Sequence, residues 1–184
     1  PKAGKNLFSE LNLELKEFLK ENGNLLIASF YKNSGGEILW LNDSLTLNER
    51  GLMLCDIINN AENYGLFSNK YKLLDSISEL IGLSKDTSLT STFITFICDL
   101  KWGLLSDSII KSPFIESIRN ENKLISDVAK VISTINIDSS LSMCQPNNFQ
   151  YVNLIAKLKI FNINSKLSKN KVKVPSYKYD SVAS

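Results

Sequence analysis

The sequence predicts a mainly α-helical fold, a compact bundle of six to seven helices around a hydrophobic central helix at about 88–105, with one small β-hairpin near 25–41. Three observations support this fold class. Apolar residues recur at steps of three and four along most of the 184-residue chain, which is the spacing of one helix face. Only 8 glycines and 4 prolines interrupt these patterns. The segment 88–105 is apolar nearly all round, as a helix surrounded by other helices is.

The first predicted elements are one helix and the hairpin. Apolar residues at helical spacing predict an amphipathic helix over 7–21, which Gly23 ends. Residues 25–31 are rich in Leu, Ile, Phe and Tyr and predict a strand, and residues 37–41 predict a returning strand. The Asn-Ser-Gly-Gly sequence at 33–36 permits positive φ angles, as a hairpin turn requires.

The middle of the chain contains two helix start signals. The sequence Thr-Leu-Asn-Glu at 46–49 matches a capping box and predicts a helix to about residue 61. A further helix is predicted over about 69–81. Thr87 or Ser88 is then the expected N-cap of the central helix.

The C-terminal half predicts three more helices. A serine followed by proline at 112–113 indicates the start of a short helix. Helical spacing predicts a second over about 121–135, and residues 136–148 are expected to form a polar loop. The last helix begins at Phe149, with Phe149, Val152, Ile155, Leu158 and Phe161 expected to face inward.

Charge is unevenly distributed between the two parts of the chain. Residues 1–164 are expected to form a single globular helical domain, and residues 165–184 a basic C-terminal tail that is extended or disordered. The chain has a net charge of +2, yet residues 157–184 carry seven lysines and one aspartate, a local charge of +6. Lysines alternating with apolar and aromatic residues can follow a phosphate backbone while stacking on bases. The same composition is typical of a segment that folds onto a protein partner.

The candidate binding residues lie in this tail and at the two tryptophans. The tail residues that are candidates for binding a nucleic acid or a protein partner are Lys166, Lys169, Lys171, Lys173, Tyr177, Lys178 and Tyr179. Trp40 and Trp102 are candidate interface aromatics, because tryptophan is enriched at the centres of protein interfaces. The alternative is that each packs at the edge of the core.

The residue types exclude several kinds of catalysis. The chain has no histidine, so Ser-His-Asp and Cys-His mechanisms are impossible within it. Cys55, Cys98 and Cys144 lie too far apart for a zinc-binding pattern and are expected to be buried, reduced thiols. We therefore expect no catalytic residue, no cofactor and no metal. An enzyme that works through carboxylates such as Asp75 and Glu79, four residues apart on one helix, is the least favoured alternative.

The sequence thus predicts a non-enzymatic interaction or assembly protein, acting through a helical surface, the basic tail or both. Its expected partner is another protein or a second copy. The alternative is an accessory protein that binds RNA or DNA. No apolar stretch is long enough to insert into a membrane, and the unpaired cysteines favour an intracellular location, cytoplasmic or nuclear. Abundant Asn, Ile, Lys and Ser are typical of an AT-rich genome, and a virus, whose protein would act in the host cell, is one such source.

Overall fold

The computed structural model describes residues 7–23, 25–71, 77, 79–103, 120–134 and 136–167. Within these ranges the chain forms seven α-helices and two short 3-10 helices, so the mainly helical prediction is confirmed. The elements are α1 (Leu7–Glu21), α2 (Leu26–Asn33), α3 (Glu49–Asn59), η1 (Ala61–Tyr64), η2 (Ser68–Tyr71), α5 (Gly82–Trp102), α8 (Glu121–Thr134), α9 (Ile137–Cys144) and α10 (Phe149–Leu167).

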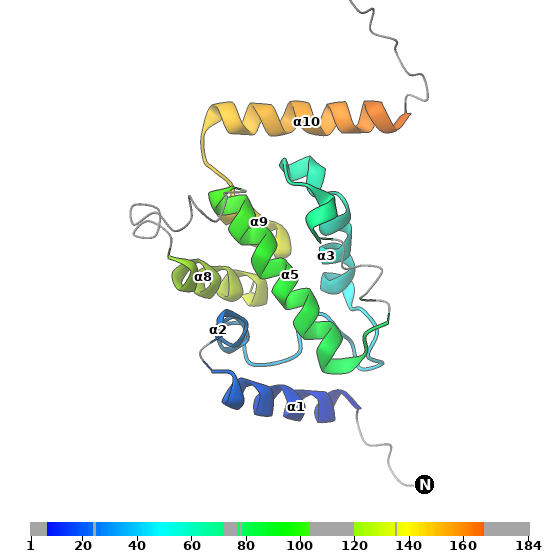
Figure 1. Cartoon of the computed structure of the whole chain (residues 1–184), viewed down its shortest axis with the longest axis vertical. Helices are drawn as coiled ribbons and strands as arrows, with labels where there is room; N and C mark the ends of the chain where they lie inside the picture. Colours follow the sequence, from blue (N-terminus) through cyan, green and yellow to red (C-terminus); the bar gives the residue numbers. More distant parts are fainter. Residues whose placement is uncertain are drawn as a thin grey trace, which may run out of the picture.

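Helix α5 runs diagonally through the middle of the molecule, as Figure 1 shows. It contacts α1, α2, α3 and α9, while α8 packs between α2 and α9. Helix α1 crosses one end of the bundle and α10 crosses the opposite end (Figure 1). The predicted central helix is therefore present, and the two helices nearest the chain termini cover opposite ends of the body.

Helix α5 begins at Gly82, six residues before the predicted start. Its N-cap residue is Ile81, and the predicted caps Thr87 and Ser88 lie inside the helix. The Thr87 hydroxyl donates to the Leu83 carbonyl oxygen at 2.8 Å, so it bonds back to the preceding turn and does not cap. The fully buried side chains Leu89, Phe93, Phe96 and Ile97 form the middle of the core.

The predicted β-hairpin is wrong, because residues 26–33 form helix α2. A short, continuous apolar run is compatible with either a buried helix or a buried strand, and periodicity alone does not distinguish them. Ala28, Phe30 and Tyr31 are fully buried, and the Phe30 ring packs edge-on against Phe93 with 5.8 Å between centroids. Packing against α5 and α8 therefore decides the helical state.

The glycines of the predicted hairpin turn end α2 instead. Gly35 and Gly36 have φ angles of +112° and +73°, and the Gly36 N–H donates to the Tyr31 carbonyl oxygen at 2.8 Å. Glu37 is exposed, and residues 38–41 then cross the bundle as buried, irregular chain. The β-pairing recorded in the described residues is an isolated bridge between Leu41 and Leu47.

Two further boundaries differ from the prediction. Helix α3 is capped by Asn48, whose side chain accepts from the Gly51 N–H at 2.9 Å, whereas Thr46 pairs with the Asn42 side chain. The predicted loop 136–148 contains helix α9, capped by Asn136, which accepts from the Ser139 N–H at 2.8 Å. Serine-rich α9 has a weak apolar pattern and depends on its contacts with α8 and α5.

Other predictions fall partly or wholly outside the described residues. The helices predicted over 7–21, 121–135 and from 149 onward correspond to α1, α8 and α10. The helix predicted over 69–81 is described only in part. Residues up to 71 belong to the 3-10 helix η2, and of the rest only residues 77 and 79–81 are described. The short helix predicted after residue 112 lies outside the described residues. None of the helices described is long and apolar enough to cross a lipid bilayer.

Candidate functional site

Helix α10 lies across one end of the bundle and rests chiefly on η1. Its inner face is formed by Tyr151, Ile155, Leu158 and Asn162, of which Ile155 is only 8% exposed. The Asn162 amide donates to the side-chain oxygen of Asn63 at 3.2 Å. The Lys159 ammonium lies 5.5 Å from the centre of the η1 tyrosine ring, a cation–π distance. One face of the helix therefore holds it on the body.

The remainder of α10 is unusually apolar for exposed surface. Six large hydrophobic side chains of this helix are 56% to 81% exposed: Phe149, Val152, Leu154, Ile160, Phe161 and Ile163. Single exposed apolar residues are normal, whereas several large ones on one helix make that helix a candidate interaction surface. A helix that is apolar on more than one side is normally covered on more than one side.

A groove of about 490 Å³ lies between α10, η1 and the C-terminal end of α5. Its lining includes Tyr64, Leu100, Trp102, Tyr151 and Leu158, so it is mostly apolar with aromatic walls. Lys101 and Asp99 also line the groove. The exposed surface of α10 and this groove are next to each other, and together they make one end of the molecule the strongest candidate for partner binding.

The two candidate tryptophans lie in different environments. Trp40 is fully buried, and its indole N–H donates to the Thr90 hydroxyl at 2.8 Å. Its ring packs against Phe93 with 5.6 Å between centroids, so Trp40 belongs to the core and does not reach the surface of this chain. Trp102 is half-buried and lines the groove beside α10.

Most of the candidate tail residues lie outside the part of the chain that the structure describes. These are Lys169, Lys171, Lys173, Tyr177, Lys178 and Tyr179. Lys166 belongs to the last turn of α10, which runs to Leu167. The prediction that the tail binds a partner is therefore not tested by the structure.

Two buried carboxyl groups connect elements of the core. Asp86 accepts hydrogen bonds from the Tyr31 hydroxyl at 2.5 Å and from the Trp40 backbone N–H at 2.8 Å. Burial raises the pKa of Asp86 above its usual value, although these hydrogen bonds act in the opposite direction. Asp99 forms an ion pair with Lys70 at 2.6 Å and accepts from the Tyr71 hydroxyl. Both carboxyl groups hold α5 against neighbouring segments.

The cysteines are buried thiols in this structure. Cys55, Cys98 and Cys144 are each at most 9% exposed. Burial raises the pKa of the Cys144 thiol to about 12 and raises the pKa of the Cys55 thiol as well. Among the described residues, no group of three or more Cys, Asp or Glu side chains is arranged to hold a metal ion.

The surface of α10 was not recognised from the sequence. We expected Phe149, Val152 and Phe161 to face inward, whereas the structure exposes all three. The missed signal is the number of apolar residues between 149 and 163, which is too large for one helix face. Such a pattern, on a helix that the described body covers on one side, makes the helix a candidate interface.

Comparison with known proteins identifies a family but no individual relative. No curated protein and no solved structure matches the chain. The sequence model of the family described as the Scaffold domain matches residues 26–158. The match begins at the first residue of α2 and ends within α10, so it covers most of the helical body. The chain belongs to the Scaffold domain family.

Proposed function

We propose that this chain is a non-enzymatic assembly protein that binds a protein partner through the exposed surface of α10. The observation that carries the proposal is the set of six exposed, large apolar side chains on this one helix. Fully burying a side chain of this size contributes about 1.5–3 kcal/mol. Partner binding to α10 would therefore have a substantial hydrophobic driving force.

The arrangement of the buried polar groups supports a structural role for them. Asp86 and Asp99 are surrounded by donors from α2, η2 and the segment before α3, and each joins α5 to another element. Catalytic carboxyls normally face a cleft where substrate can reach them, whereas Asp86 is fully buried. Asp99 does line the groove, and there its carboxylate is engaged by Lys70 and Tyr71. The family description is consistent with assembly but does not specify a partner.

Site-specific photo-cross-linking in cells tests the proposal. A benzophenone amino acid replaces Phe149 or Phe161 on α10, or Phe67 on the body as a control. These phenylalanines are 81%, 67% and 70% exposed, so the three probes are comparably accessible. We expect discrete adducts from at least one α10 position, identified by mass spectrometry as self-adducts or as one reproducible protein. Adducts no more frequent at both α10 positions than at Phe67 would contradict the proposal.

A further inference from the structure

One stripe of α10 has a spacing that is symmetric about its centre. Residues 149, 152, 156, 160 and 163 lie within an arc of about 80° when each residue advances the helix by about 100°. Ala156 is exposed at the centre of the stripe. Phe149 and Ile163 lie seven residues before and after it, and Val152 and Ile160 lie four residues before and after it. The spacing of the residues in the stripe is therefore the same when counted from either end.

We propose that α10 pairs in antiparallel orientation with α10 of a second copy, with the two Ala156 residues facing each other across a two-fold axis. This inference rests on the proposed assembly function and names the partner of one stripe. In such a pair Phe149 opposes Ile163 of the other copy, and Val152 opposes Ile160. Every large apolar residue of the stripe then meets another, which is the self-complementarity that a two-fold interface requires.

Ala156 is small enough for the point at which the two copies of α10 would be closest. Packed helix axes are about 8–10 Å apart, and the closest spacing needs small side chains at the contact. Alanine at the centre permits close approach, while the larger residues four and seven positions away pack on both sides of the axis. The stripe from Phe149 to Ile163 spans about 21 Å, nearly the whole helix.

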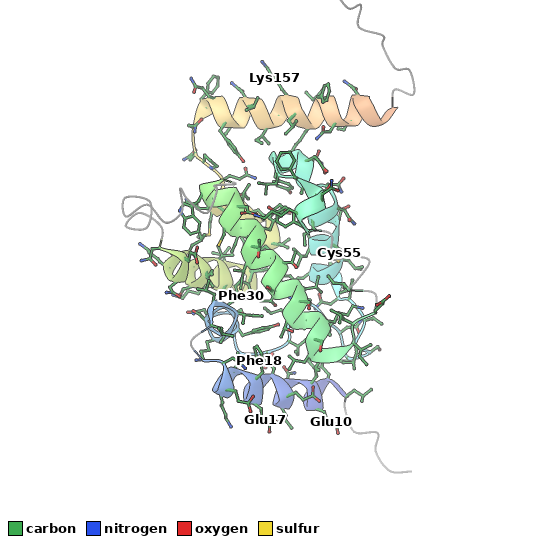
Figure 2. All side chains as sticks on the ribbon, viewed as in Figure 1. Glu10, Glu17, Phe18, Phe30, Cys55 and Lys157 are labelled. Carbon is green, nitrogen blue, oxygen red and sulfur yellow. The ribbon has the colours of Figure 1, made fainter. Side chains whose placement is uncertain are left out.

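The helix dipoles favour the antiparallel orientation. A parallel pair would align the two α10 dipoles side by side, whereas an antiparallel pair opposes them. The helix carries Lys157, Lys159 and Lys166 and no acidic residue, and none of these lysines lies in the stripe. Lys157 lies about 100° from the centre of the stripe, and Figure 2 shows it on the side of α10 that faces away from the body.

The two remaining large apolar residues exposed on α10 lie on a different flank. Leu154 and Phe161 are seven residues apart and therefore share one side of the helix. That side is about 140–160° from the centre of the stripe, so the self-pairing leaves it uncovered. The neighbours Ile160 and Phe161, which are 60% and 67% exposed, are thus a matched pair of positions on and off the stripe.

Disulfide trapping tests the pairing. In an Ala156→Cys variant, two facing cysteines have Cα atoms about 4–6 Å apart, which is within the range of a disulfide. The control is Asn164→Cys. Residue 164 lies eight residues from the two-fold axis, so the cysteines of the two copies would be about 24 Å apart along the helices. Mild oxidation should convert the Ala156→Cys chain to a disulfide-linked dimer and leave the Asn164→Cys chain without a disulfide link between copies. The native thiols are buried and do not compete.

A second substitution shows whether the trapped dimer depends on the stripe. Adding Ile160→Glu to Ala156→Cys should abolish the cross-link, whereas adding Phe161→Glu should leave it unchanged. Equal cross-linking of the cysteines at 156 and 164, or survival of the cross-link with Ile160→Glu, would overturn the self-pairing. If photo-cross-linking captures one other protein at α10 while Ala156→Cys stays monomeric, the self-pairing is wrong and the assembly function stands. Failure of both experiments would remove both proposals.

Discussion

The side chain of Asp86 joins two helices through its hydrogen bond with Tyr31. The Tyr31 hydroxyl of α2 donates to the carboxylate of Asp86 in the first turns of α5, at 2.5 Å. The Asp86 carboxylate also accepts from the backbone N–H groups of Leu39 at 3.4 Å and Trp40 at 2.8 Å. These donors would otherwise be buried without partners in irregular chain, which is costly. One carboxyl group therefore allows the segment after α2 to cross the core without forming a strand.

Replacement of this carboxyl should destabilise the fold. Asp86→Asn offers one acceptor oxygen and an NH₂ group where three donors converge, so we expect a loss of about 1–3 kcal/mol in the free energy of unfolding at neutral pH. Urea unfolding followed by circular dichroism measures it. An unchanged unfolding midpoint would contradict this role of Asp86.

The loss should depend on pH in a defined direction. Because burial raises the pKa of Asp86, the folded state binds the carboxyl proton more tightly than the unfolded chain. The resulting stabilisation is complete below the unfolded-chain value of 3.8 and is lost as pH rises through the raised pKa. The difference in stability between the wild-type and Asp86→Asn chains should therefore be larger near pH 3 than near pH 7.5. A difference that grows with pH would have the wrong sign.

Gly51 should not tolerate alanine although it lies in a helix. A Cβ atom at Gly51 would lie 2.5 Å from the Trp40 carbonyl oxygen and 3.1 Å from a Leu47 methyl group. Helix propensity alone favours alanine by about 1 kcal/mol, but the clash should destabilise by about 1–3 kcal/mol. Gly23→Ala is the control, because its Cβ would make only ordinary contacts. Thermal melts of both variants should show a lower Tm for Gly51→Ala alone.

The native thiols should react slowly. Cys144 is fully buried, and burial raises the pKa of its thiol to about 12. At pH 8 little thiolate is present at Cys144, and reagents have little access to it. Titration with an aromatic disulfide reagent should label Cys144 in the native chain only on the timescale of unfolding, and at once in denaturant. Rapid labelling of Cys144 in the native chain, located by peptide mass spectrometry, would contradict its burial.

The basic tail gives a separate test of the nucleic-acid alternative. Deletion of residues 168–184 removes four lysines and should leave assembly through α10 unchanged. If the tail contacts phosphates, the full chain should bind single-stranded RNA in filter assays at low salt, with affinity that falls steeply as salt increases. The deletion should then abolish binding. An absence of binding by the full chain at low salt would end this alternative.

The sequence correctly predicted the helices whose own apolar pattern matches the surface that they bury. The amphipathic pattern of α1 and the apolar character of α5 are strong local signals, and both helices are present. The run at 25–31 was ambiguous because strand and helix both bury a short apolar segment. Contacts with α5 and α8, which are distant in sequence, decide in favour of α2. Helix α9 was missed for a related reason, since its burial comes from α8 and not from a strong pattern of its own.

The candidate site was harder to predict from the sequence than the fold. Tryptophan content drew attention to Trp40, which forms a buried hydrogen bond with Thr90. Nothing in the local sequence around residue 86 indicates that its carboxyl serves a segment 46 residues away. The exposed face of α10 becomes visible only when the body is seen to cover one side of that helix.

The solution mass of two neighbouring variants tests the central claim, self-assembly through α10, most directly. Light scattering over a range of concentrations is applied to the wild-type, Ile160→Glu and Phe161→Glu chains, with melting curves to show that each is folded. We predict twice the monomer mass for the wild-type and Phe161→Glu chains, and the monomer mass for Ile160→Glu, which should still melt in one cooperative transition. A monomeric wild-type chain at every concentration, or a dimer that persists in Ile160→Glu, would contradict self-assembly through α10.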